Sequence, residues 1–229
     1  MKKLISVFLA VFVIASLAAC GREESSMGTE RDSVVQSTGL ESEEKEDNNE
    51  SIQSSDTQAT ETDEAGTKAL VVYFSATGNT KAVAETLTEL TGADIYEIVP
   101  EQPYTDEDLN YNDRTTRATV GQNDPDARPA IQGSITNFEQ YNVIYVGYPI
   151  WWGDMPRILY TFFDAYDFSG KTIAPFCTSG GSGLSGTPGT IAGLETGATI
   201  LDGLHVSDSA VDNAESQVLE WLVEIGQAE

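Results

Sequence analysis

The sequence predicts an α/β protein, a three-layer α/β/α sandwich around a five-stranded parallel sheet. Apolar runs alternate with helical patterns between residues 67 and 229, which is typical of a parallel sheet with helices on both faces. The first run, "ALVVYF" at residues 69–74, is apolar throughout, as expected for a strand buried on both faces. Five such runs fit the strand order 2-1-3-4-5.

The predicted elements alternate along the chain. Strands are expected at residues 69–74, 94–99, 142–149 and 171–177, with a fifth inside residues 197–206. Helices are expected from the first strand to Gly92, over residues 155–166 with Asp154 as N-cap, and over residues 212–226. Residues 101–134 are long, polar and poorly periodic. We expect a functional or disordered loop there, with a helix within residues 106–120.

Residues 1–20 have the pattern of an export signal. Two lysines precede an apolar run at residues 4–19, which is shorter than the roughly 20 residues that span a membrane. The run ends in "LAAC", which resembles the bacterial lipobox, in which Cys20 would be lipidated and become the mature N-terminus. An ordinary signal peptide and an uncleaved anchor are the alternatives. We therefore expect an extracytoplasmic protein, lipid-anchored to the cell membrane.

Residues 21–66 are strongly acidic and contain no aromatic residue. Their 14 acidic residues stand against three basic ones, and such a segment cannot bury enough apolar surface to fold. We predict a disordered acidic tether, followed by a single domain at residues 67–229. The whole chain has a net charge of −25, which disfavours nucleic acid as a partner.

Three polar loops follow predicted strands, at the edge where open α/β sheets bind ligands. The first, "SATGNT", consists of Ser75, Ala76, Thr77, Gly78, Asn79 and Thr80. Unpaired amides at a helix N-terminus favour an anion, and these hydroxyls suit a phosphate monoester. A plain Ser/Thr helix cap explains the composition equally well. The loop itself holds no Lys or Arg, which argues against a nucleotide-hydrolysing loop of the Walker type.

The second loop, "YPIWWGDMP", follows the third strand. It contains Pro149, Ile150, Trp151, Trp152 and Gly153. The adjacent tryptophans offer a stacking surface to a flat conjugated ring. The alternative is that they seal the core beneath the loop, and we expect at least one to do so.

The third loop, "CTSGGSGLSGTPG" at residues 177–189, is rich in glycine. It contains Thr178, Ser179, Gly180, Gly181 and Gly183. Its G-x-G-x-x-G match follows the fourth strand rather than the first, so it is weak evidence for a dinucleotide site. Bare backbone against the edge of a planar ligand fits the composition better, and a flexible turn is the alternative.

Taken together and in this order, the loops resemble the flavin-binding loops of flavodoxins. "VVYFSATGNT" is similar to their phosphate-binding signature. "GYPIWWGDMP" and "PFCTSGGSGLSG" are similar to the flavin loops of a flavodoxin-like subfamily found as bacterial lipoproteins. The resemblance covers residues 68–229 and implies noncovalent FMN. The first loop would hold the phosphate, and the other two would flank the isoalloxazine ring.

An exported flavodoxin-like protein is expected to transfer electrons through its flavin. The partner would be a redox protein or the membrane quinone pool. The alternative is an FMN-dependent quinone oxidoreductase driven by NAD(P)H or a quinol, and a third is a non-redox binding domain. Reduced nicotinamides are scarce outside the cytoplasm, which favours the electron carrier. His205, the single histidine, is expected to be structural, and neither a metal site nor a catalytic residue is expected.

Overall fold

The computed structural model describes residues 68–228. The expected export signal, the lipobox cysteine Cys20 and the acidic tether lie outside these residues. Among the helices of residues 68–228, none is both long enough and apolar enough to cross a membrane.

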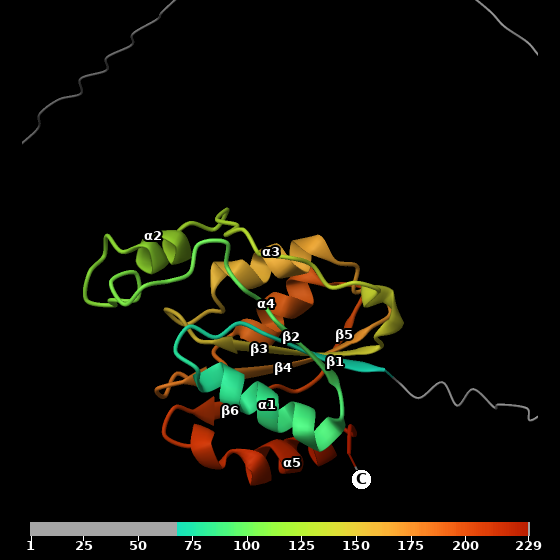
Figure 1. Cartoon of the computed structure of the whole chain (residues 1–229). Coiled ribbons are helices and arrows are strands. Elements are labelled where there is room, and N and C mark those ends of the chain that lie inside the picture. Colours follow the sequence, from blue (N-terminus) through green and yellow to red (C-terminus); the bar gives the residue numbers. More distant parts are fainter. Residues whose placement is uncertain (1–67, 229) are drawn as a thin grey trace, which may run out of the picture. The chain divides into compact units, whose positions relative to one another are not determined.

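Strands and helices alternate along the described chain (Figure 1). In order they are β1 (Ala69–Tyr73), α1 (Asn79–Thr91), β2 (Asp94–Glu97), α2 (Arg117–Asn123), the 3-10 helix η1 (Phe138–Gln140), β3 (Val143–Pro149), α3 (Arg157–Ala165), β4 (Thr172–Ser179), α4 (Thr187–Leu194), β5 (Thr199–Ile200), β6 (Leu204–Ser207), the 3-10 helix η2 (Val211–Asn213) and α5 (Glu215–Glu224). The sheet is parallel and its strand order is β2-β1-β3-β4-β5. The predicted order 2-1-3-4-5 is confirmed.

The predicted fifth strand is two short strands rather than one. β5 pairs with the beginning of β4, and β6 pairs with its end. The cause is Pro175, in the middle of β4. The N–H of Leu201 donates to the carbonyl of Ile173 at 2.9 Å. Every second residue of a parallel strand bonds to the same neighbouring strand. Pro175, two residues after Ile173, is therefore the next residue of β4 that should bond on this side. Because proline has no N–H to donate, the ladder is interrupted there.

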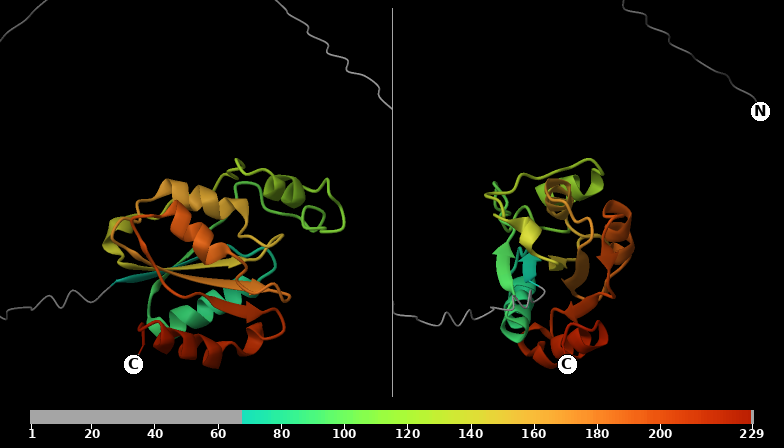
Figure 2. Two further views of the ribbon diagram at one scale, coloured as in Figure 1. Left: turned by 180° about the vertical axis from the view of Figure 1, so that it is seen from behind. Right: turned by 90° about the vertical axis from the view of Figure 1, so that its right-hand side faces the viewer.

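Helices cover both faces of the sheet, α1 and α5 on one side and α3 and α4 on the other (Figures 1 and 2). The side chains of β1 alternate between two hydrophobic cores. Leu70 and Val72 pack toward α3, whereas Val71 and Tyr73 pack toward α1 and α5. Both faces of β1 are therefore buried, which explains why its sequence is apolar throughout.

The helix α3 starts later than predicted. Pro156 is its N-cap, with extended backbone, so the prediction of Asp154 as N-cap is wrong. The Asp154 carboxylate instead accepts hydrogen bonds from the N–H of Met155 at 2.9 Å and the hydroxyl of Tyr160 at 2.7 Å. These contacts fix the end of the second loop against the helix that follows it.

The helix α4 was not predicted, because its two glycines and Pro188 resemble loop residues. Pro188 lies in the first turn, where a missing N–H leaves no bond unmade, and Ile191 anchors the helix in the core. The third loop therefore ends at Gly186. Thr178 and Ser179 belong to the end of β4.

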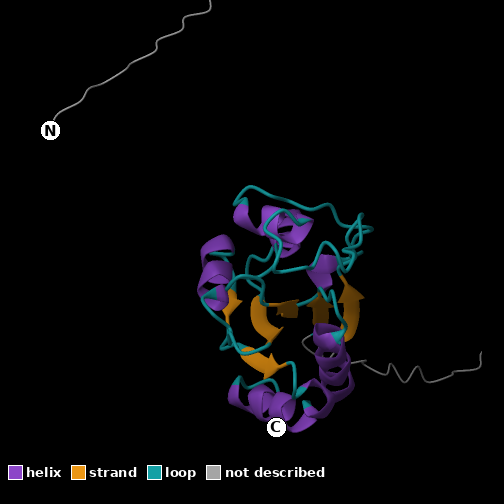
Figure 3. Cartoon of the chain, turned by 90° about the vertical axis from the view of Figure 1, so that its left-hand side faces the viewer, coloured by secondary structure: helices purple, strands orange, loops and turns teal. Residues whose placement is uncertain are grey.

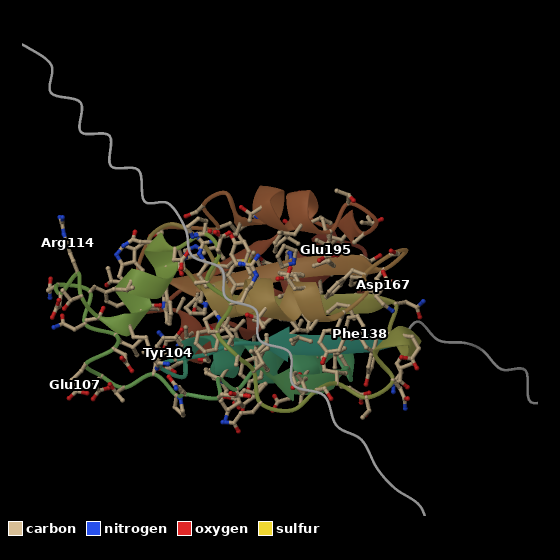
Figure 4. The ribbon with its side chains drawn as sticks, turned by 90° about the horizontal axis from the view of Figure 1, so that it is seen from above. Tyr104, Glu107, Arg114, Phe138, Asp167 and Glu195 are labelled. Carbon is tan, nitrogen blue, oxygen red and sulfur yellow. The ribbon has the colours of Figure 1, made fainter. Side chains whose placement is uncertain are left out.

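Residues 101–134 form an ordered layer over α3 rather than a disordered loop (Figure 1). The side-chain amide of Gln122 donates to the carbonyl of Met155 at 3.0 Å. The hydroxyl of Thr161 donates to the carbonyl of Pro129 at 2.9 Å. Only α2 is helical here, so the helix predicted within residues 106–120 is largely absent. Figure 4 shows Tyr104, Glu107 and Arg114 of this layer at one end of the domain, opposite Phe138 and Asp167.

Candidate functional site

The three polar loops meet at the carboxyl ends of the adjacent strands β1, β3 and β4, seen with the helices around them in Figure 3. Thr178 connects them. Its hydroxyl lies 2.8 Å from the hydroxyl of Thr80, and its carbonyl accepts the N–H of Ile150 at 3.0 Å. Thr80 and Thr178 are both buried. The loops are thus linked by hydrogen bonds below the surface, and the Thr80 hydroxyl takes part in this link.

The first loop leaves the N-terminus of α1 open. Gly78 is the N-cap, with a φ of 96° and no side-chain cap hydrogen bond, so these residues do not form the plain Ser/Thr cap. The Gly78 N–H donates to the hydroxyl of Ser75 at 3.1 Å, which holds the turn. A Cβ built on Gly78 would meet nothing within 4 Å. The first amides of α1 have no intrahelical partner, as at any helix N-terminus, and they follow a turn that is open beside exposed Thr77.

The two tryptophans of the second loop have different environments. Trp151 is 3% exposed, and its ring centroid lies 5.6 Å from that of Phe74 and 5.1 Å from that of Tyr104. Trp152 is 43% exposed. The expectation that at least one tryptophan seals the core holds for Trp151. Trp152 is left with ring surface for a ligand.

Trp152 also has an unfavourable backbone conformation. Trp151 and Asp154 exchange two backbone hydrogen bonds, of 2.8 and 3.0 Å, across a two-residue turn. The turn residues Trp152 and Gly153 have φ values of 48° and 80°, as in a type I′ turn, which favours Asn-Gly. A bulky residue with positive φ is rare, and such outliers cluster at ligand sites. The strained backbone therefore indicates that the Trp152 side chain has a role other than stabilising the fold.

The third loop depends on glycine for its shape. Gly181 and Gly183 have φ values of 141° and 63°, which side chains disfavour. Ser179, at the end of β4, is buried, and its hydroxyl accepts the N–H groups of Gly181 at 3.3 Å and Ser182 at 3.0 Å. The loop is therefore a fixed turn rather than a flexible one.

Two residues at the rim of the site were missed by sequence reasoning, Tyr111 and Asp208. The ring centroid of Tyr111, from the 101–134 layer, lies 5.0 Å from that of Trp152. Partial burial raises the pKa of Tyr111, and the nearby Asp208 carboxylate raises it further. Asp208 also lies 3.5 Å from the position of a Cβ on Gly180. The sequence holds no signal for these contacts, because they join residues about 30 to 100 positions apart.

The 101–134 layer also borders the first loop. A cavity of about 180 Å³ is lined by Ser75 and Ala76 of that loop and by Pro103 and Tyr104 of the layer. A larger cavity of about 350 Å³ is lined by residues of the layer itself and by Pro100, with Arg117 at its wall. The Arg117 guanidinium stacks 4.1 Å from the Tyr104 ring centroid and donates to the carbonyl of Pro103 at 2.6 Å. These contacts brace the layer internally, and Tyr104 in turn packs against Trp151 of the second loop and Phe74, which precedes the first loop.

Comparison with known protein families assigns the chain. A family model described as flavodoxin matches residues 68–225, from the residue before β1 to the end of α5. The chain belongs to the flavodoxin family. No curated protein matches it.

Solved structures support this flavodoxin assignment. A candidate flavoprotein from Bacteroides eggerthii is 39% identical, with a TM-score of 0.66 over 70% of this chain and 99% of its own. A second, from Bacteroides uniformis, is 36% identical, with a TM-score of 0.65 over 69% and 99% of the two chains. A flavoprotein from Lactobacillus acidophilus, solved in complex with FMN, shares the fold at 24% identity, with a TM-score of 0.51 over 64% and 97% of the two chains.

The flavodoxin strand order also determines which loops face each other. In the order β2-β1-β3-β4-β5, the chain reverses direction between β1 and β3, and doubly wound sheets bind ligands at such switch points. The first loop follows β1 and the second follows β3. They flank the switch point, and the glycine-rich loop after β4 adjoins them through Thr178.

Proposed function

We propose that this flavodoxin-family domain binds FMN noncovalently at the three joined loops and serves as an electron-transfer protein. The observation that carries the proposal is the combination, at the β1/β3 switch point, of an uncapped helix N-terminus, an exposed tryptophan and a fixed glycine turn. These match the phosphate, the ring face and the ring edge of a flavin mononucleotide.

The first loop fits the phosphate without a basic side chain. The open amides at the N-terminus of α1 and the helix dipole favour an anion, and the Thr77 hydroxyl and the Asn79 amide are further donors. Lys81, which follows the loop, lies 3.9 Å from the carboxylate of Glu85 on the exposed side of α1. The phosphate would be held by neutral donors, which suits a cofactor that is kept rather than hydrolysed.

The second and third loops fit the ring. Trp152 would stack on one face of the isoalloxazine, beside Ile150 and Gly153, and the backbone of Gly180, Gly181 and Gly183 would lie along one edge. When bound, FMN supplies the one- and two-electron chemistry. The protein positions the ring, limits the access of water with Trp152 and Tyr111, and leaves an edge of the ring near the surface for electron exchange.

The second candidate is an FMN-dependent quinone oxidoreductase, driven by NAD(P)H or a quinol. Steady-state assay of the FMN-loaded protein with NADPH and a soluble quinone separates the two functions. We expect no rapid turnover with NADPH, and fast oxidation of the chemically reduced protein by a one-electron acceptor. Rapid NADPH-dependent quinone reduction would select the oxidoreductase instead.

We further propose that a lipid on Cys20 tethers this domain to the outer face of the cytoplasmic membrane, where a redox protein or the quinone pool exchanges electrons with it. A thioether-linked diacylglyceryl group supplies two acyl chains, which anchor stably where one is marginal. We expect Cys20→Ala to move the protein from the membrane to the soluble fraction, as followed by fractionation of the producing bacterium. A wild-type protein that is soluble and unlipidated by mass spectrometry would contradict this.

Trp152→Asn tests the stacking role of Trp152, because it should affect the stability of the apo-protein and its affinity for FMN in opposite directions. Asn-Gly is the preferred type I′ turn, so the free energy of unfolding of the apo-protein should be unchanged or higher. Loss of stacking, worth about 1–3 kcal/mol per aromatic contact, should weaken FMN binding about tenfold or more. Fluorescence titration with FMN and denaturant unfolding measure the two quantities.

Trp151→Ala is the matched control, because the neighbouring ring is buried in the core. We expect it to lower the free energy of unfolding by about 3–5 kcal/mol, as large aromatic truncations do. If Trp152→Asn left FMN affinity unchanged, Trp152 would not be a ring contact.

A further inference from the structure

His205 lies beside the start of the third loop. In the register of β4 and β6, His205 is opposite Cys177 and Ser207 is opposite Ser179. The His205 Nε2 lies 2.8 Å from the Ser179 hydroxyl oxygen. Ser179 is 6% exposed and His205 is half-buried. The only histidine of the protein is therefore joined to the residue that precedes Gly180.

The direction of this hydrogen bond follows from counting donors. A serine hydroxyl has one proton to donate and two positions at which it accepts. Both accepting positions of Ser179 are used, by the N–H groups of Gly181 and Ser182. The Ser179 proton must therefore be donated to His205 Nε2. A ring nitrogen that accepts carries no proton, so neutral His205 carries its proton on Nδ1.

The same bonds set the direction of the loop carbonyls. In a planar trans peptide, the C=O and the N–H of one peptide unit point in opposite directions. Because the N–H groups of Gly181 and Ser182 point at Ser179, the carbonyls of Gly180 and Gly181 point away from it. The loop thus offers two acceptors, and two of its amides are already used. Such a backbone recognises a ligand edge that carries an N–H donor.

We propose that His205 is a positioning residue for this loop. As the Nδ1–H tautomer it accepts the Ser179 proton, leaves the serine oxygen free to bind two loop amides, and so fixes the carbonyls of Gly180 and Gly181 toward the N–H edge of the isoalloxazine. The role of His205 in positioning the loop is inferred from the hydrogen bonds alone. The identity of the ligand depends on the proposed FMN function. His205 itself does not touch the ligand.

The tautomer is measured without FMN. With a single histidine, ¹⁵N-labelled protein gives one imidazole spin system in long-range ¹H–¹⁵N spectra, recorded at alkaline pH, where free imidazoles are neutral. We expect the wild type to show the Nδ1–H form alone. In Ser179→Ala, we expect the imidazole no longer to be held in that single tautomer. An Nε2–H imidazole in the wild type would overturn the pairing.

The effect on the ligand is tested with His205→Leu and Ser179→Ala. His205→Leu leaves the Ser179 proton without its acceptor, and Ser179→Ala leaves both loop amides without theirs. We expect FMN and riboflavin affinities to fall about tenfold or more in each variant. His205→Gln, whose amide oxygen accepts a proton, should stay within about threefold of wild type. Ser207→Ala removes a hydroxyl from the strand position opposite Ser179 and should change nothing.

The outcomes separate this proposal from the proposed function. If His205→Leu or Ser179→Ala binds FMN as tightly as the wild type, the positioning role is wrong. If His205→Leu fails to fold, Ser179→Ala and the tautomer decide. If the wild type binds no FMN, the proposed function fails, while the tautomer still confirms or overturns the pairing of His205 with Ser179.

Discussion

Thr77→Asp is expected to reduce FMN affinity at least about 100-fold, because it places a carboxylate where the phosphate should bind. Two unit charges 4 Å apart near a protein surface repel by about 4 kcal/mol, and 1.4 kcal/mol corresponds to a factor of ten in affinity. Without ligand, the carboxylate would itself occupy the positive end of α1. The apo-protein should then be more stable by about 0.3–1 kcal/mol. Isothermal titration calorimetry and urea unfolding measure the two changes.

The controls for Thr77→Asp isolate the charge and the phosphate. Thr77→Asn has nearly the same shape without the charge and should lose no more than about tenfold in FMN affinity. Riboflavin lacks the phosphate, so its affinity should respond far less to Thr77→Asp. An equal loss of riboflavin and FMN binding would show that the first loop does not hold the phosphate.

Gly147→Ala is expected to destabilise the fold by about 3 kcal/mol or more. Gly147 lies within β3, opposite Phe176 of β4. A Cβ on Gly147 would come within 2.2 Å of the Phe176 ring, which is fully buried. The ring has no free space to move into, and overpacking of a dense core costs about 1–3 kcal/mol, occasionally more. Urea unfolding followed by far-ultraviolet circular dichroism measures the loss.

A second substitution tests the cause. Phe176→Leu replaces the ring with a smaller side chain and leaves room for a Cβ at position 147. The double variant Gly147→Ala/Phe176→Leu should therefore lose less stability than the sum of the two single variants. Gly189→Ala is the matched control, since a Cβ there meets nothing within 4 Å. In the helix α4 it should stabilise the protein by about 0.5–1 kcal/mol. Additive effects of Gly147→Ala and Phe176→Leu would contradict the proposed clash.

Strand positions were predictable because burial leaves a direct pattern in the sequence. β1 and β3 lie in the middle of the sheet, so both of their faces are apolar, and their predicted ranges agree with the observed ones within about one residue. The break between β5 and β6 was not predictable in the same way. It depends on Pro175, which lies on a different strand and acts through a hydrogen bond that it cannot make.

Some features of the candidate site were predictable and others were not. The composition of the three polar loops marked them as candidate binding segments, and the predicted strand order brings them together at one edge of the sheet. The division of roles between Trp151 and Trp152 could not be predicted, because it depends on the packing of Phe74 and Tyr104 around one ring. His205 was expected to be structural, and only the geometry of Ser179 connects it to the third loop.

FMN binding is tested by titrating the purified apo-protein with FMN, followed by visible absorbance and flavin fluorescence. We predict one FMN per chain, quenched flavin fluorescence and a yellow protein that keeps its flavin through gel filtration. Thr77→Asp, assayed beside it, should remain colourless. A folded wild-type protein that leaves FMN fluorescence unchanged and elutes without flavin would contradict the proposed FMN site.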